Sequence, residues 1–284
     1  MGKAGRGDWW KLQFAGSRFG TGGKACSQID FLMAELTDLV SAADEWLRLD
    51  EIPDYPQALN GLQIQGTRKV KKIVAAVDAC FPVIDAACDA GADLLVVHHG
   101  LFWQGAQKIT GPVYTKLKRA LEHGLAIYSA HIPLDVHREL GNNAQLMKAL
   151  EILDAVPFFP WKGIDLGLSA NVNWDRDELL AKVGEATGAE AHICPGGPGN
   201  VKKIGIITGG AGSEIGAIAE TGIDTFITGE GPHWSYTSAE ELGINLVYGG
   251  HYATETFGVK ALASKWCEEF ADVEWEFYDH PTGL

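Results

Sequence analysis

Two adjacent histidines, His98 and His99, follow an apolar run and are the first residues of the sequence that could do chemistry. The run LLVV at 94–97 predicts a strand buried on both faces, after which Gly100 lets the chain turn away. Consecutive strand residues point to opposite faces, so one metal ion would not normally bind both imidazoles. Such a pair is commonly a core or surface feature; the alternative is that each histidine binds its own ion.

The spacing His-x-x-x-carboxylate occurs twice, as His131 with Asp135 and as His251 with Glu255. Taken singly, His251 and Glu255 could form a helix-surface pair, and Asp135 could cap a helix. Together with the two adjacent histidines, these residues exceed the three ligands that a catalytic zinc requires. We therefore predict a site for two metal ions with the ligands His98, His99, Asp135, His251 and Glu255.

The predicted ligands are imidazoles and carboxylates without thiolate, which suits Zn, Fe, Mn, Co or Ni and does not choose among them. A bridging carboxylate would hold the ions about 3.5–4 Å apart. Two divalent ions against two carboxylates leave a local charge of roughly +2, so the cleft would attract an anionic small molecule.

Other polar residues near the predicted site have less specific patterns. Glu230 and His233, in TGEGPHW, and His131 could act as acid/base groups or support the ligands. The turn ITGGAGSEIG at 207–216 follows a predicted strand, and its amides could hold a phosphate. It lacks the Walker lysine and the G-x-G-x-x-G spacing, so a simple tight turn is the alternative. Its candidate anion-binding residues are Gly209, Gly210, Gly212 and Ser213.

An internal repeat indicates which elements position these residues. Residues 70–100 align without a gap onto 201–231 with nine of 31 positions identical, and 126–135 then matches 246–255. Each copy alternates apolar strand patterns with helical stretches, which predicts α/β halves with mainly parallel sheets. Ligands of such sheets gather at the carboxyl ends of strands, so the metal site is expected there, between the halves.

The chain is expected to divide into four parts: a flexible extension or start-site artefact at 1–32, a first α/β half at 33–155, a connector with short elements at 156–200, and a second α/β half at 201–284. Met33 is the expected effective start. A helical period follows it, marked by Leu36, Leu39, Val40, Ala43 and Leu47.

Composition excludes several classes of protein. The net charge of −14 over 284 residues disfavours binding to nucleic acid. The five cysteines are scattered without a C-x-x-C pair, which favours free thiols in a reducing cytoplasm over a disulfide framework. We also expect no membrane association, because no apolar run approaches the roughly 18–20 residues of a membrane span.

Five motifs follow one another along the chain: NGLQIQG (60–66), LLVVHHGLFW (94–103), AHIPLDVHRELGNNAQL (130–146), TGE (228–230) and GGHYATETFGVKAL (249–262). Their order resembles that of the Nif-three-like dinuclear metal-centre family, whose members are often labelled GTP cyclohydrolase 1 type 2 homologues. The resemblance covers roughly residues 33–284, and the short connector matches the compact form without an inserted domain.

The resemblance implies a toroidal homohexamer with metal sites facing an interior cavity. It implies that His98 and His99 each bind one ion, that Asp135 joins the ion of His99, that His251 joins the ion of His98, and that Glu255 bridges. The activity it implies is a metal-dependent hydrolase, either GTP cyclohydrolase-like or acting on another phosphorylated or cyclic amide-like substrate. A non-catalytic metal-binding assembly or scaffold for protein partners is the alternative.

Overall fold

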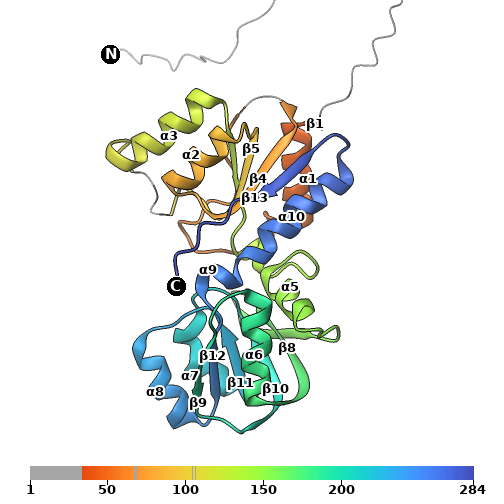
Figure 1. The fold of residues 1–284 in the computed structure, drawn as a ribbon, viewed down its shortest axis with the longest axis vertical. Coiled ribbons are helices and arrows are strands. Elements are labelled where there is room, and N and C mark those ends of the chain that lie inside the picture. The colour runs from red at the N-terminus through yellow and green to blue at the C-terminus, as the bar shows by residue number, and fades with distance from the viewer. Residues whose placement is uncertain (1–33, 67–68, 104, 106) are drawn as a thin grey trace, which may run out of the picture. The chain divides into compact units, whose positions relative to one another are not determined.

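Two sheets, a two-stranded ribbon and the helices packed on them form the described part of the chain in the computed structural model (Figure 1). The structure describes residues 34–66, 69–103, 105 and 107–284. The α/β class predicted from the sequence is confirmed. The predicted extension at 1–32 and the predicted start at Met33 lie outside the described residues.

The first sheet has five strands in the order β13-β4-β5-β6-β2. The first four are parallel, and β2 runs antiparallel to β6 at the edge. Its central strands are runs of Val, Ile, Leu and Ala buried on both faces, as parallel strands covered by helices require. In chain order the strands are β2 (Gly61–Ile64), β4 (Lys72–Asp78), β5 (Leu94–His99), β6 (Ala126–Ser129) and β13 (Glu274–Phe277).

Alternate residues of the central strands feed two hydrophobic clusters. Ile73 and Ala75 of β4 face the cluster that contains α1 and α10, whereas Val74 faces the cluster that contains α2 and α3. The predicted helical period is confirmed as α1, with all its marker residues buried except the partly buried Val40. These helices are α1 (Leu36–Leu47), α2 (Phe81–Asp89), α3 (Gly111–His123) and α10 (Thr256–Glu269), and the ribbon beside them pairs β1 (Ala34–Glu35) with β3 (Lys69–Val70).

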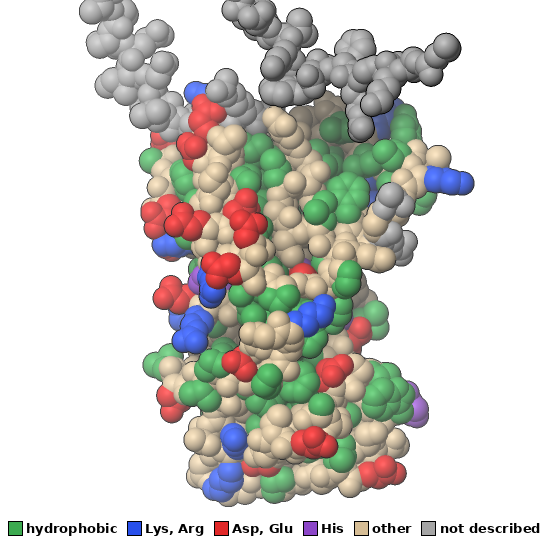
Figure 2. All heavy atoms as spheres, turned by 180° about the vertical axis from the view of Figure 1, so that it is seen from behind, with side chains coloured by type: hydrophobic (Ala, Val, Ile, Leu, Met, Phe, Trp, Pro, Cys, Tyr) green, Lys and Arg blue, Asp and Glu red, His purple; other side chains and the backbone are tan. Residues whose placement is uncertain are grey.

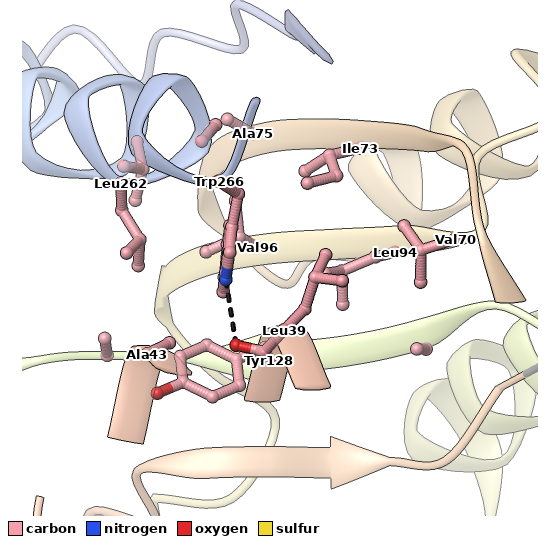
Figure 3. Packing of buried hydrophobic residues seen from close by; sticks show 14 of the residues in the cluster. Leu39, Ala43, Val70, Ile73, Ala75, Leu94, Val96, Tyr128, Leu262 and Trp266 are labelled. Atoms are coloured by element: carbon pink, nitrogen blue, oxygen red, sulfur yellow. Dashed lines mark hydrogen bonds between the residues drawn. The ribbon is translucent and has the colours of Figure 1, made fainter. Parts of the chain in front are cut away.

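Trp266 of α10, near the C-terminus, packs against the first sheet (Figure 3). Its buried indole lies edge-on to Tyr128, with ring centroids 5.6 Å apart, and its Nε1 donates a hydrogen bond to Leu39 O at 2.9 Å. Burying such an aromatic ring makes one of the largest single contributions to a core. The last part of the predicted second half, 201–284, therefore packs against the first sheet, which β13 also joins.

The second sheet has six strands in the order β7-β8-β10-β11-β12-β9. Its parallel centre is β10-β11-β12, and β8 and β9 flank this centre antiparallel. The predicted connector, 156–200, supplies β7, β8 and β9 to this sheet and α6 to the hydrophobic cluster packed on it. The strands are β7 (Val156–Trp161), β8 (Ile164–Asp175), β9 (His192–Pro195), β10 (Asn200–Ile206), β11 (Thr225–Thr228) and β12 (Asn245–Tyr248).

Two short helices, α4 and α5, lie in the chain between the last parallel strand of the first sheet and the second sheet, and further helices lie between or after the strands of the second sheet. In chain order they are α4 (Ile132–Asp135), α5 (Asn142–Ala149), α6 (Arg176–Thr187), the 3-10 helix η1 (Ala211–Glu214), α7 (Ile215–Ala219), α8 (His233–Leu242) and α9 (His251–Thr254). Both sheets thus contain three parallel strands joined by helices, β4-β5-β6 and β10-β11-β12. The internal repeat itself stays a prediction.

The surface matches the acidic composition, with its net charge of −14. On the face shown in Figure 2, acidic side chains are spread widely, and basic side chains stand singly or in small groups among them. No helix in the described part of the chain is long and apolar enough to cross a bilayer.

Candidate metal centre

The five predicted ligands come together where β5, α4 and α9 end or begin. His98 Nε2 lies 3.5 Å from Asp135 Oδ2 and 3.5 Å from Glu255 Oε1. Glu255 Oε2 lies 3.4 Å from His99 Nε2 and 3.2 Å from His251 Nε2. Glu255, between α9 and α10, is buried at the centre of the group and faces all three imidazoles.

The adjacent histidines reach this group from the end of β5 by bonding to different neighbouring strands. His98 Nδ1 donates to Ala130 O, just beyond β6, at 2.8 Å. His99 Nδ1 donates to Asp78 Oδ1, at the end of β4, at 2.9 Å. Strict strand alternation predicts rings that face apart, but the strand ends at His99 and the two ring centroids lie only 4.9 Å apart.

The partners of the ring nitrogens fix the tautomers of the site histidines. Carboxylate and carbonyl oxygens only accept hydrogen bonds from a ring nitrogen, so the proton of each ring lies on Nδ1. His251 follows the same rule through Glu230 Oε1, and His131 through Asp54 Oδ1, both at 2.9 Å. The Nε2 atoms of His98, His99 and His251 therefore face carboxylate oxygens, and each can bind either a proton or a metal ion there.

Two buried side-chain atoms in the described part of the chain lack a hydrogen-bond partner, and both lie here: His98 Nε2 and Glu255 Oε2. Lone pairs facing lone pairs require a positive charge between them. The 3.2–3.5 Å separations exceed those of charge-assisted hydrogen bonds, which are about 2.7–2.9 Å. Two atoms about 2.0–2.2 Å from one tetrahedral ion lie roughly 3.3–3.6 Å apart, so the donor set fits metal ions.

The electrostatics also indicate a need for positive charge. Burial lowers the pKa of His98, but Asp135 and Glu255 outweigh it and raise the pKa to about 10. Burial likewise lowers the pKa of His251, but Glu255 and Glu230 raise it to about 9. Burial raises the pKa of Glu255, yet His98 and His99 bring that pKa well below its usual range. The buried carboxylate therefore stays charged and attracts cations.

The distances group the ligands differently from the grouping that the resemblance implied. Asp135 lies beside His98, and His99 forms a potential metal-binding group with His251 and Glu255. The reason is the bond of His98 to Ala130, which directs its ring toward the chain that leads into α4 and Asp135. These distances favour pairing Asp135 with His98 and His251 with His99 over the implied pairs, and which residues share an ion stays a prediction.

The other predicted polar residues take three different positions. His131 lies within the cluster, and its ring nitrogen forms a second potential metal-binding group with those of His98 and His99. Glu230 supports His251, as a residue behind the ligands would. His233 is exposed at the start of α8 and is not among the residues that line the cleft beside the cluster.

The glycine-rich turn lies against the cluster of predicted ligands, but several of its amides are already bonded. Gly209 N donates to Thr254 Oγ1 and Gly212 N to Glu230 O, whereas Gly210 and Ser213 line the cleft. A Cβ on Gly209, whose φ is +73°, would overlap Glu255 Oε1. Glycine is thus needed here for close approach, and an anion site at Gly210 and Ser213 stays a prediction.

Sequence reasoning missed the carboxylates that support two of the histidines. Asp78 ends β4 next to His99, so the strand-end rule applied to that strand could have found it. Asp54 lies in an irregular segment without a pattern, yet it also accepts from Asn60 Nδ2 and Ile132 N. Three aromatic residues of the cleft were also missed: Tyr55, Phe159 and Trp161.

The fold and the cluster define an α/β protein with buried His and Glu groups that could hold a metal ion. The family model Duf34/NIF3 (NGG1p interacting factor 3) matches residues 34–282, and the chain belongs to this family. A Deinococcus radiodurans protein named GTP cyclohydrolase 1 type 2 homolog is 41% identical over 249 residues, 87% of this chain and 94% of that protein. An Escherichia coli K12 protein of the same name is 38% identical over 251 residues, 87% and 98% of the two chains.

Solved structures agree with the family assignment. The protein ybgI, described as of unknown function, superposes with a TM-score of 0.81 at 36% identity, covering 88% of this chain and 100% of that one. TTHA1606 from Thermus thermophilus superposes with a TM-score of 0.78 at 36% identity and the same coverage.

Proposed function

We propose that this protein binds two divalent metal ions at the cluster and is a metal-dependent hydrolase. His98 and Asp135 would hold one ion, His99 and His251 the other, and Glu255 would serve both. The ligand types admit Zn, Fe, Mn, Co or Ni. The single observation that carries the proposal is the buried, unpartnered pair of atoms His98 Nε2 and Glu255 Oε2.

Two ions bound here would lower the pKa of a water and polarise the bond under attack. The chain itself would supply orientation: Asp78 and Glu230 fix the rings of His99 and His251 through their Nδ1 protons. Asp54 likewise accepts the Nδ1 proton of His131, so the Nε2 atom of His131 is free to hydrogen-bond a substrate in the cleft. The names of the relatives favour GTP cyclohydrolase-like chemistry, and hydrolysis of another phosphoester or cyclic amide uses the same residues.

The test is to compare the full chain with Glu255→Gln and the exposed control Glu220→Gln. We expect two ions per chain by elemental analysis in wild type and control, with turnover in a panel of nucleotides, phosphoesters and cyclic amides. Glu255→Gln should lose both metal and turnover. Tight metal binding without turnover under any divalent ion would favour the alternative, a non-catalytic metal-binding assembly or scaffold. An unchanged metal content in Glu255→Gln would contradict the site.

We further propose that the protein works as a homo-oligomer, the toroidal hexamer that the family resemblance implies. Exposed apolar side chains support self-association, among them Ile109, Leu153 and Trp234, whose exposed fractions are 62%, 88% and 51%. Light scattering on the purified chain should give six protomers, and a monomer at micromolar concentration would contradict this.

The four cysteines of the described residues are free thiols, which supports the proposal of a reducing, cytoplasmic location. An acidic surface supports the absence of nucleic acid among the partners. A gel-shift at physiological salt would test the second point, with no shift expected.

A further inference from the structure

The cleft beside the proposed metal-binding cluster is lined on one side by aromatic residues that have no role in holding the ions. The cleft has a volume of about 260 Å³. His99, His251 and Glu255 lie along it, and its aromatic lining residues are Tyr55, Phe159 and Trp161. Pockets for drug-sized ligands are about 300–1,000 Å³, so this one suits a small molecule of one or two rings.

The β7–β8 hairpin that carries two of these aromatics is built to hold them in place. Lys162 and Gly163 form its two-residue turn with φ values of +47° and +88°, so Trp161 sits at the end of a tight hairpin. Phe159 has a φ of +66° inside a strand, where a bulky residue rarely takes the left-handed conformation. Such strain persists at sites where the position of a side chain matters for binding.

Tyr55 joins the hairpin from the segment between α1 and β2. Its ring lies 5.6 Å from that of Trp161 and 5.9 Å from that of His131, and the side chain is 53% exposed. Lys162 Nζ lies over the rings of Tyr55 and Trp161 and donates to Asp54 O at 3.0 Å. Because Asp54 also holds His131, one set of contacts fixes the aromatic side relative to the cluster.

The charges of the cleft disfavour a polyphosphate. Its lining residues in the described part of the chain include no Lys or Arg, the side chains that usually bind phosphate groups. Glu214, which is not among the proposed metal ligands, lines the cleft on the side of the glycine-rich turn. The phosphates of a nucleotide that reached past the cluster would face this carboxylate, whereas a flat ring would stack on the aromatic side chains.

We propose that the cleft binds a planar nitrogen heterocycle without phosphate groups, its polar edge toward the cluster, its face on Trp161 and its rim against Tyr55. This inference rests on the proposed metal-binding function for the orientation of the ring. It narrows the substrate from nucleotides in general to small rings of the nucleobase or cyclic amide class.

The test is calorimetric titration of the zinc-loaded full chain with uracil and with 5,6-dihydrouracil, which has the same polar edge on a saturated, non-planar ring. GTP and inorganic triphosphate are titrated in parallel. We expect uracil to bind at least about tenfold more tightly than dihydrouracil, as stacking on aromatic side chains predicts. Neither GTP nor triphosphate should bind more tightly than uracil.

Trp161→Ala and Tyr55→Ala should each weaken uracil binding by about 5- to 100-fold, and Trp161→Phe should restore most of it. The matched control is Tyr114→Ala, an exposed tyrosine of α3, which should bind uracil as wild type does. Zinc content measured on every variant checks that the fold and cluster are intact.

The inference is overturned if no planar ring binds, if uracil and dihydrouracil bind equally, or if GTP binds more tightly than uracil. Zinc-free protein is titrated as well. A chain that binds no zinc but still binds uracil through Trp161 contradicts the proposed function alone. A chain that binds two zinc ions but shows no preference for the planar ring contradicts this inference alone.

Discussion

Two segments of the molecule, β4-β5-β6 and β10-β11-β12, each consist of three parallel strands. In both, an aspartate just before the second strand accepts hydrogen bonds from backbone amides at the beginning of the first strand. Asp93 Oδ2 accepts from Lys71 N at 2.8 Å and Lys72 N at 3.0 Å. Asp224 Oδ2 accepts in the same way from the backbone of the second segment, at the same two distances from Lys202 N and Lys203 N.

The opposite ends of the same strands differ. In the first segment β4 and β5 end in Asp78 and in the two adjacent histidines, which carry polar side chains to the cluster. The aligned positions in the second segment are Gly209, Gly229 and Glu230. The amino ends of the strands thus keep the same structural bonds, whereas the carboxyl ends differ in chemistry, as the position of ligands in α/β sheets leads one to expect.

The largest effect should come from Trp266→Ala, which should destabilise the first sheet more than the second. Removing this buried indole from the first sheet should cost about 3–5 kcal/mol of unfolding free energy. Hydrogen exchange should show lost protection in β4 and β5 before β10 and β11. An equal loss in both sheets would contradict the assignment of α10 to the first.

The next largest effect should come from Gly209→Ala, at the position aligned with Asp78. The new Cβ overlaps the Glu255 carboxylate in a conformation that alanine rarely adopts, so metal affinity should fall on the order of 100-fold. The control is Gly216→Ala, where a Cβ meets nothing within 4 Å. Equal affinities of the two variants in competitive titration with a chelator would argue against the tight approach.

Asp78→Ala and Glu230→Ala compare the supports of the two segments. Each frees an Nδ1 proton, on His99 and on His251, and should lower metal affinity about 10- to 100-fold. Asp78→Ala should have the larger effect, because 31% of its side chain is exposed against 43% for Glu230. The same chelator titration measures the metal affinity of both variants. A larger loss in Glu230→Ala would show that the exposure of the carboxylate does not determine how much it contributes to metal affinity.

The smallest effects should come from Asp93→Ala and Asp224→Ala, which test the hydrogen bonds that the two segments have in common. Each removes one carboxylate acceptor from two backbone amides and should cost about 1–2 kcal/mol in denaturant unfolding, with metal content unchanged. Costs that differ by more than about 1 kcal/mol would mean that the two aspartates are not equivalent.

The α/β class, α1 and the proximity of the five predicted ligand residues could be predicted from the sequence, because apolar periodicity locates strands and strand ends locate sites. The distances that place His98 beside Asp135 could not, since they depend on the bond from His98 to Ala130, just beyond the neighbouring strand. The return of β13 to the first sheet could not either: a short strand carries no local signal for the sheet it joins.

The aromatic side of the cleft could not be predicted from the sequence either. Tyr55 and Trp161 lie in segments far apart in the sequence, yet their rings are in contact, and Lys162 Nζ bonds to Asp54 O beside them. No spacing rule relates such residues, because the fold between them sets their distance.

The central claim is that the two histidines of β5 each hold a separate ion, bridged by Glu255. Anomalous scattering from metal-loaded crystals of the full chain tests it most directly. We expect two peaks about 3.5–4 Å apart, one beside His98 and Asp135 and the other beside His99 and His251. A single peak shared by His98 and His99, or no peak at Glu255, would contradict the account.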